Sequence, residues 1–246
     1  MSPAHAQSHS SIQLASRMTS SLKGISSMAT RLVLGDLARD YRERTGVTLA
    51  LESVGGVDAA RRVQAGEPFD AVFLASDALE RLMASGHVLA GSRVDLVRSP
   101  VAVAVPQGAS PPDLSTEAGL RQAVEQAESI GYSTGPSGVA LVALFERWGL
   151  MSALQGRIVT PPPGVPVASL VARGEVALGF QQLSEMLNVP GIQLVGGLPS
   201  EVEIVTVFSG GVAAASSQPD AVRQLLAFMA SPLAHEAKRR QGMTPA

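Results

Sequence analysis

The sequence contains no cysteine among its 246 residues. This absence excludes disulfide bonds, thiolate catalysis and zinc sites built on cysteine, but it fits either an oxidising or a reducing compartment. Histidine offers no other metal site, because His5 and His9 lie near the N-terminus and His87 and His235 are isolated, expected surface residues. We therefore expect neither a metal ion nor an organic cofactor.

A surplus of positive charge is also missing, since 19 Lys and Arg residues face 21 Asp and Glu residues. Proteins that bind nucleic acid usually carry clustered basic residues. The nearest such cluster is "KRR" at 238–240, which we interpret as the solvated face of a terminal helix. A nucleic-acid partner is not expected.

Long apolar runs are absent as well, because the longest is "VAVAV" at 101–105, far short of the ~20 residues that cross a bilayer. Common enzyme signatures are missing too: the sequence has no G-x-S-x-G, H-E-x-x-H, P-loop or G-x-G-x-x-G motif. With 46% hydrophobic residues, the chain is long enough for one large domain or for two lobes of ~100–150 residues.

The first twenty residues are polar and rich in serine, and they lack the apolar middle of a signal peptide. Two interpretations remain open for this segment, 1–20. "AHA" at 4–6, followed by Gln7, resembles the end of a trimmed leader, which would place the protein in the periplasm or outside the cytoplasm. Alternatively Met18 is the natural start and the protein is cytoplasmic.

Beyond this segment, strand patterns alternate with helix patterns, which is typical of an α/β fold with parallel, doubly wound sheets. Helices are expected at 29–44 and 115–128, in several shorter stretches, and from Pro219 and Pro232. Asp77 is the expected N-cap of one of the shorter helices. Strands are expected at 21–25, 47–54, 69–76, 100–105, 130–133, 157–160, 176–180, 203–208 and 212–216.

Four junctions between a strand and a helix share small or amide-bearing residues: "SSM" (26–28), "VGGV" (54–57), "TGPSG" (134–138) and "FQQLS" (180–184). Helix starts present unpaired N–H groups and a partial positive charge, so converging junctions of this kind would surround a small anion with donors. Structural alternatives remain open for three of them. Ser26 and Ser27 are equally typical of helix caps, and Gly55–Gly56 and Ser137–Gly138 are typical of tight turns.

The pair Gln181–Gln182 favours a functional role, because two adjacent amides at the end of a strand seldom help folding. Nearby carboxylates oppose an anion: Asp58 is expected to cap its own helix, and Glu52 and Glu185 add negative charge. The cations that would offset them are Arg31, Arg61 and Arg62, each of which is also typical of a helix surface.

Five segments together resemble the molybdate-binding branch of the type 2 periplasmic solute-binding proteins, in order, from about Leu22 to the C-terminus. They are "GISSMATRLVLGDLARDYRERTGV", "ESVGGVDAARRVQAGEPFDAVFLASDALERL", "YSTGPSGVAL", "LVARGEVALGFQQLSEM" and "SPLAHEAKRRQGMTPA".

The resemblance implies two α/β lobes, each a doubly wound and mostly parallel sheet, with a ligand cleft between them. Lobe 1 would comprise residues 21–100 and 205–246, and lobe 2 residues 101–204. It also implies a small anionic ligand and the membrane complex of an ABC transporter as partner. We expect the protein itself to be a monomer.

The same resemblance implies which residues contact the ligand. In the order of the family's loops they are Ser26, Ser27 and Met28; Gly55, Gly56 and Val57; Ser137 and Gly138 after Pro136; Val165; and Gln181 and Gln182. The chain departs from the family pattern twice. "GGV" replaces a second serine loop, and Gln182 stands where the family has a tyrosine. These departures favour a larger ligand with several oxygens, such as a di- or tricarboxylate, over molybdate or tungstate.

The chain also resembles a subgroup of this family that includes aconitate isomerase, an enzyme built on the binding-protein fold. Two functions therefore follow as hypotheses. The first, which we favour at this stage, is a solute-binding protein that delivers a small anion to a transporter. The second is an isomerase that moves a proton on an unsaturated tricarboxylate and needs a general base in the cleft. No residue is singled out as that base, although Glu185 and Asp58 are nearest in position.

Overall fold

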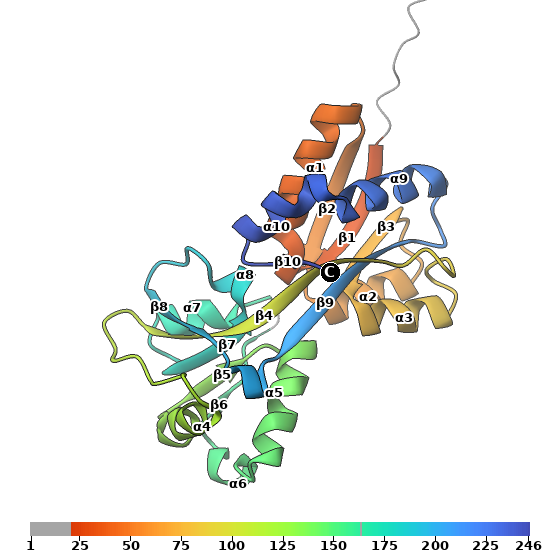
Figure 1. The fold of residues 1–246 in the computed structure, drawn as a ribbon. Helices are drawn as coiled ribbons and strands as arrows, with labels where there is room; N and C mark the ends of the chain where they lie inside the picture. Colours follow the sequence, from red (N-terminus) through yellow and green to blue (C-terminus); the bar gives the residue numbers. More distant parts are fainter. Residues whose placement is uncertain (1–20, 163) are drawn as a thin grey trace, which may run out of the picture.

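Strands and helices alternate along the chain, as the sequence predicts, and they are distributed over two lobes (Figure 1). The computed structural model describes residues 21–162 and 164–246. The expectations for residues 1–20, a trimmed leader or an extension, lie outside the described residues. Within the described residues, no helix combines the length and apolar character that spanning a membrane requires.

The upper lobe in Figure 1, lobe 1, combines the N-terminal part of the chain with its C-terminal part. Its elements are β1 (Ser21–Ser27), η1 (Met28–Thr30), α1 (Arg31–Thr45), β2 (Thr48–Val54), α2 (Gly56–Gln64), β3 (Ala71–Ala75), α3 (Ser76–Ala84), α9 (Pro219–Ala230), η3 (Pro232–Ala234), α10 (His235–Arg240) and β10 (Thr244–Pro245).

The lower lobe, lobe 2, is built from the middle of the chain. Its elements are α4 (Glu117–Gln126), β5 (Ile130–Tyr132), α5 (Pro136–Arg147), α6 (Met151–Leu154), β6 (Ile158–Val159), α7 (Val167–Ala172), β7 (Leu178–Gln182), α8 (Leu183–Met186), β8 (Ile192–Gly197) and η2 (Ser200–Val202).

Two long strands, β4 (Val94–Pro106) and β9 (Val205–Val212), pass from one lobe toward the other and pair with each other in antiparallel fashion. They connect a parallel group in lobe 1 (β1, β2 and β3) to a parallel group in lobe 2 (β5, β6 and β7), in the order β2-β1-β3-β9-β4-β7-β5-β6. Strands β8 and β10 add to β4. The sheet is therefore mixed, with parallel strands inside each lobe and antiparallel strands at the crossing.

Apolar side chains form separate cores above and below the crossing. In lobe 1, one core lies under α1 and α9 and includes Leu37, Phe73 and Leu226, while a second lies under α2 and α3. In lobe 2, one core gathers around Phe145 and Phe180, and another lies under α7. Burying each large apolar side chain stabilises the fold by roughly 1.5–3 kcal/mol. We propose that the lobes divide near residues 100 and 205, where these cores meet.

The crossing strands differ from the sequence prediction. A strand was expected only at 100–105, but β4 begins at Val94 and continues through Pro100. Two strands were expected at 203–208 and 212–216, whereas β9 is continuous from Val205 to Val212. The glycines of β9 suggest that the strand is interrupted, but the strand is continuous. Gly210 allows close packing, because a Cβ at this position would lie 2.3 Å from the Leu226 side chain. Strand β8 was not predicted.

Two side chains near helix ends also differ from expectation. Helix α3 begins at Ser76 with Ala75 as its N-cap, so Asp77 lies in the first turn and pairs with Arg81 instead of capping the helix. In α10, Lys238 is only 1% exposed, so the "KRR" segment is not wholly a solvated face. Its neighbours Arg239 and Arg240 are exposed.

Candidate interlobe anion site

The first two predicted junctions lie side by side in lobe 1. Strands β1 and β2 are parallel, and Ser27 is in register with Val54 at their carboxyl ends. A Cβ built on Gly56 would lie 3.6 Å from the Ser27 Cβ, so the glycine backbone approaches this serine closely. Gly55 is the N-cap of α2 and no side chain caps the helix. The first amides of α2 are thus presented beside Ser27.

Ser27 is the N-cap residue of η1, but its side chain makes no capping hydrogen bond, and Ser26 is not at a cap position. Ser26 is fully buried, and its hydroxyl lies 2.8 Å from the Ser53 hydroxyl, linking β1 to β2. The Ser27 hydroxyl is buried and has no hydrogen-bond partner among the described residues. Of the two serines, only Ser27 has a free hydroxyl. Met28, which follows, is partly exposed.

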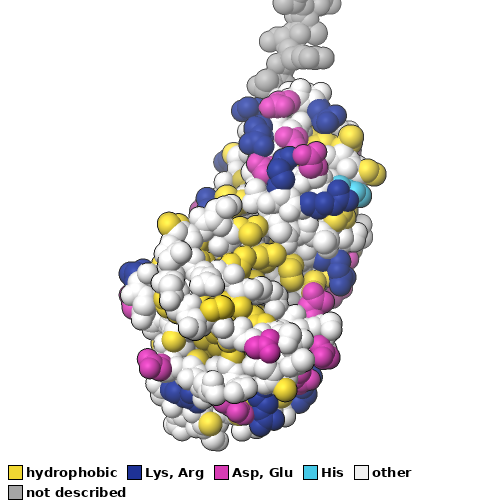
Figure 2. Space-filling model, turned by 60° about the vertical axis from the view of Figure 1, so that its left-hand side comes forward, with side chains coloured by type: hydrophobic (Ala, Val, Ile, Leu, Met, Phe, Trp, Pro, Cys, Tyr) yellow, Lys and Arg dark blue, Asp and Glu magenta, His cyan; other side chains and the backbone are white. Residues whose placement is uncertain are grey.

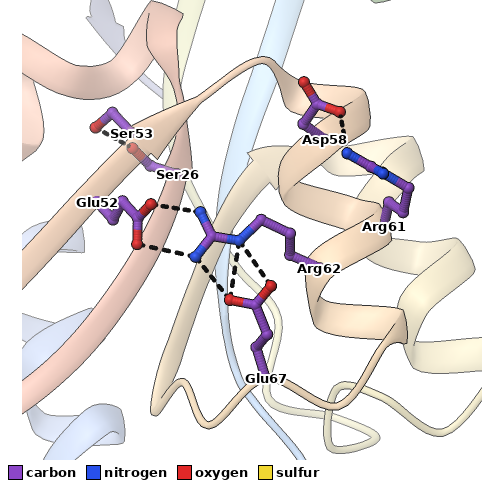
Figure 3. Close-up of polar contacts among 7 residues, drawn as sticks. All are labelled: Ser26, Glu52, Ser53, Asp58, Arg61, Arg62 and Glu67. Carbon is purple, nitrogen blue, oxygen red and sulfur yellow. Dashed lines mark hydrogen bonds and ion pairs between the residues drawn. The ribbon is translucent and has the colours of Figure 1, made fainter.

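The charged residues near these loops pair with one another (Figure 3). Asp58 is not the cap of α2; it pairs with Arg61 at 2.7 Å, so it does not compete with an anion for the helix amides. Arg62 hydrogen-bonds both Glu52 and Glu67, and these bonds hold the pKa values of both carboxyls below their usual range. Arg61 and Arg62 are therefore engaged in pairs, and Arg31 is exposed on α1.

In lobe 2 the third junction forms a tight turn into α5, in which only Ser137 and Gly138 are buried. The hydroxyls of Ser133 and Ser137 lie 2.9 Å apart, and Ser137 is buried. A Cβ on Gly138 would lie 1.7 Å from the Ser133 carbonyl oxygen, so only glycine fits this position. Gly135 is the N-cap of α5, and no side chain caps the helix. The turn therefore presents the start of a 12-residue helix.

The fourth junction lies beside the third, because β5 and β7 are parallel and Tyr132 is in register with Phe180. Gln181 and Gln182 are the last residues of β7, both buried and on opposite faces of the strand. The Gln181 Oε1 accepts a bond of 3.0 Å from the Ala168 amide at the start of α7, next to the partly buried Val165. The Gln182 Nε2 donates to the Thr206 hydroxyl at 2.8 Å, but its Oε1 has no partner in the described structure.

The two lobes touch between η1 and α8. The Ser184 hydroxyl donates to the Ala29 carbonyl oxygen at 2.9 Å, joining the segment after Ser27 to the segment after Gln182. Gly242 lies against Leu183, also on α8. We name this contact the interlobe seam: Ala29 and Gly242 of lobe 1 against Leu183 and Ser184 of lobe 2.

Glu185 follows directly on this seam. Burial raises the pKa of its carboxyl to about 7, and a hydrogen bond from the Gln181 side chain opposes that rise. Among the described residues no lysine or arginine forms an ion pair with it. A partly exposed carboxyl that titrates near neutrality is suited to accept and return a proton.

The structure therefore brings Ser27 and Gly56 together in lobe 1, places Ser137 next to the end of β7 in lobe 2, and joins the two regions at the seam. The side chain of Val57, another predicted ligand contact, is 69% exposed and does not join these buried residues. Two depressions of about 430 and 500 Å³ lie elsewhere, one beside Arg62 and one beside Pro112. Within the described residues, no group of three His, Asp or Glu side chains could hold a metal.

Sequence reasoning missed three buried polar residues on the crossing strands, Ser99, Thr206 and Ser209. A hydroxyl residue within an otherwise apolar strand could have indicated such a position. For Ser99 this signal is hard to recognise, because Arg98 and Pro100 stand beside it in "VRSPVAV". On the face shown in Figure 2, charged side chains gather toward the two ends, and the middle is mostly hydrophobic or uncharged.

Comparison with known proteins agrees with this architecture. Residues 22–244 match the family model described as bacterial extracellular solute-binding protein. A curated relative, aconitate isomerase of a Pseudomonas species, is 40% identical over 238 residues, which cover 94% of this chain and 90% of the relative.

Solved structures show the same fold. The periplasmic molybdate-binding protein of Azotobacter vinelandii superposes with a TM-score of 0.75 at 22% identity, covering 91% of this chain and 98% of that chain. The substrate-binding domain of a putative molybdenum ABC transporter from Clostridium difficile gives a TM-score of 0.71 at 15% identity, covering 92% and 99%. The two-lobed architecture and the match over nearly the whole chain lead to one conclusion: this protein belongs to the bacterial extracellular solute-binding protein family.

Proposed function

We propose that the protein binds an unsaturated tricarboxylate between its lobes and isomerises it, with aconitate as the substrate. The observation that carries the proposal is the position of Glu185, which directly follows Ser184 of the interlobe seam and whose pKa is raised by burial to about 7. The substrate comes from the curated relative named aconitate isomerase, 40% identical over nearly the full length of both chains.

Neutral donors are suited to hold such a trianion. The Ser27 hydroxyl, the first amides of α2 beside Gly56, and the start of α5 at Ser137 offer hydrogen bonds, and the carboxylate nearest to the α2 amides, Asp58, pairs with Arg61. Charge-assisted hydrogen bonds contribute roughly 1.5–3 kcal/mol each, so several of them support micromolar binding.

The reaction requires one base and no external reactant. The Glu185 carboxylate takes a proton from the methylene carbon of aconitate, and the released electron pair forms a double bond to the central carbon. The electrons of the former double bond then take the proton back at the other outer carbon. The former double bond is now a single bond, and the geometry in which the new double bond forms decides whether the product is the cis or the trans isomer. Hydrogen-bond donors at Ser27 and Ser137 stabilise the charge that moves onto a carboxylate during the shift.

A turnover assay tests this function. Purified protein is incubated with trans-aconitate, and the cis isomer is measured by chromatography. We expect conversion by the wild type and a loss of 10²-fold or more in the Glu185→Gln variant, since general-base catalysis contributes typically 10²–10⁴-fold. Absence of turnover at high protein concentration would contradict the proposal. The matched control is Glu236→Gln, which alters an exposed carboxyl on α10.

The family match favours a second candidate, a receptor that passes a small anion to an ABC transporter. This role requires a location outside the cytoplasm, which is that of the family. A thermal-shift panel of molybdate, tungstate, sulfate, phosphate, citrate and aconitate separates the two roles. A receptor stabilised by one of these anions but without turnover would replace the isomerase. Stabilisation by molybdate or tungstate alone would identify an oxyanion-binding protein.

A further inference from the structure

Polar residues interrupt the apolar pattern of the two crossing strands, and a third polar residue, Gln182, ends the neighbouring strand β7. On β4, Ser99 stands between Val97 and Val101, which belong to the cores of the two lobes. On β9, Thr206 stands two residues before Phe208 and two residues after Ile204, which precedes the strand. Side chains two positions apart point to the same face of a strand, so apolar residues at 99 and 206 would simply have joined the two cores.

These interruptions are adjacent in space. Ser99 is directly opposite Thr206 in the antiparallel pair of β4 and β9. Gln182 is opposite Val101 on the other side of β4, and its Nε2 lies 2.8 Å from the Thr206 hydroxyl. Ser99, Thr206 and Gln182 thus form one row across the crossing strands, which we name the hinge row.

The hinge row has unused hydrogen-bonding capacity. The Ser99 hydroxyl and the Gln182 Oε1 are both buried, and neither has a partner in the described part of the chain. Leaving a buried polar group without a partner costs about 1–3 kcal/mol, so a fold selected only for stability would favour apolar residues here. These two atoms are therefore available to a group from outside the chain.

The row can present donors to an anion. The two ends of the Gln182 amide are interchangeable, because the Thr206 hydroxyl can accept from Nε2 or donate to Oε1. In the second arrangement the Gln182 amide group and the Ser99 hydroxyl both offer hydrogens. No member of the row is acidic, so a cationic ligand would gain no charge compensation from it.

We propose that the hinge row, Ser99, Thr206 and Gln182, is a subsite that binds one carboxylate group of the ligand. The subsite thereby favours di- and tricarboxylates over small oxyanions such as molybdate. This inference rests on the proposed tricarboxylate site and names the part of it that determines ligand class. Lobe closure would place the row beneath the ligand, next to the seam formed by Ser184 and Ala29.

Titration calorimetry with tricarballylate, succinate and molybdate tests the subsite in the full chain. Tricarballylate is a saturated tricarboxylate and does not react. We expect Ser99→Ala to weaken tricarballylate binding by about tenfold, since one charge-assisted bond is lost. Thr206→Val should weaken binding to a similar extent, because the Gln182 amide loses the hydroxyl that orients it, and Thr206→Ser should restore the affinity lost in Thr206→Val. Binding of molybdate, if any, should change less than twofold.

The control is Ser209→Ala, which removes another buried hydroxyl of β9, one that donates to Asp95 at 2.6 Å. We expect it to lower the melting temperature without changing affinity, whereas Ser99→Ala should not lower the melting temperature of the free protein. Unchanged affinity for every bound anion in Ser99→Ala and Thr206→Val would overturn the subsite while leaving the tricarboxylate site standing. A wild type that binds molybdate but no carboxylate would overturn the proposed function, and one that binds no anion would overturn both.

Discussion

At the scale of single residues, Glu185 and Lys238 are two groups whose pKa burial shifts strongly, and they shift in opposite senses. Burial raises the pKa of Glu185 to about 7 and lowers that of Lys238 to about 8. In both cases burial disfavours the charged form. Neither side chain forms an ion pair within the described residues. The two groups therefore differ from the paired surface carboxylates and arginines of this chain.

Glu185 should give both activity and stability a distinctive pH dependence. As a base it must be deprotonated, so kcat/KM should rise with pH up to about 7 and then level off. Between pH 4.5 and about 7 the folded protein holds a proton that the unfolded chain has released, so the free energy of unfolding falls as pH rises. The Glu185→Gln variant should lack this fall, which is roughly 1–3 kcal/mol. Parallel stability curves for wild type and variant in chemical denaturation would contradict the assignment.

Lys238 should show the opposite slope at alkaline pH. Between about pH 8 and 10.5 the folded state has lost a proton that the unfolded state still binds, so the free energy of unfolding rises with pH. At pH 7 the Lys238→Met variant should be more stable than the wild type by about 1–3 kcal/mol, with the gap closing toward pH 10. Melting curves at pH 7, 8.5 and 10 measure it. A variant less stable than the wild type at pH 7 would show that the ammonium group has a favourable partner.

At the scale of elements, the turn before α5 depends on one glycine. Gly138→Ala should displace the start of α5, because its Cβ would lie 1.7 Å from the Ser133 carbonyl oxygen. We expect a destabilisation of at least ~2 kcal/mol and a loss of anion binding. The control is Gly35→Ala on α1, where nothing lies within 4 Å of the new Cβ and helix propensity predicts a gain of ~0.5–1 kcal/mol. Equal melting temperatures for the two variants would contradict this description of the turn.

The Arg62 bonds fix α2 against β2 (Figure 3). Arg62→Met should lower the melting temperature and reduce its dependence on salt, because Glu52 and Glu67 lose their shared partner. Anion affinity should change less than threefold, since the guanidinium is already engaged. Arg61→Met, which removes a more exposed side chain, should change neither property. A large loss of anion affinity in Arg62→Met would mean that the arginine turns toward the ligand.

Hydrophobic periodicity predicted the short strands and helices of lobe 1 well, because β3 and the helices around it have uniform apolar faces. The crossing strands were harder to predict, since Pro100 and the glycines at 210 and 211 are normally signals of a break. The glycines of β9 are needed for close packing against side chains that are far away in the sequence, such as Leu226, and a local sequence pattern does not reveal such contacts. For the same reason two members of the hinge row, Ser99 and Thr206, were missed, because they become neighbours only when β4 and β9 pair.

The candidate site was partly predictable. Small residues at strand ends identified Ser27, Gly56, Ser137 and Gln182, because strand ends and helix starts are where backbone amides are exposed. The sequence did not distinguish Ser26, whose hydroxyl is used by Ser53, from Ser27. The sequence also suggested three arginines as counter-charges for the anion. Two of them, Arg61 and Arg62, instead form ion pairs with the carboxylates at 52, 58 and 67.

At the scale of the whole molecule, two lobes with separate cores are joined by two long strands and one seam. This arrangement fits a hinge whose closure is coupled to ligand binding, because the donors of the proposed site come from both lobes. The family match and the structural neighbours place the chain among proteins of this design. The proposed isomerase would use the same closure to exclude water from the proton transfer.

The most direct test of this picture is a crystal structure of the protein with tricarballylate. We expect one molecule between the lobes, with carboxylate oxygens within hydrogen-bond distance of Ser27, Gly56, Ser137 and Gln182, and with Glu185 facing a methylene carbon. A tricarballylate bound outside the cleft, or a cleft whose donors face separate surfaces, would contradict the central claim.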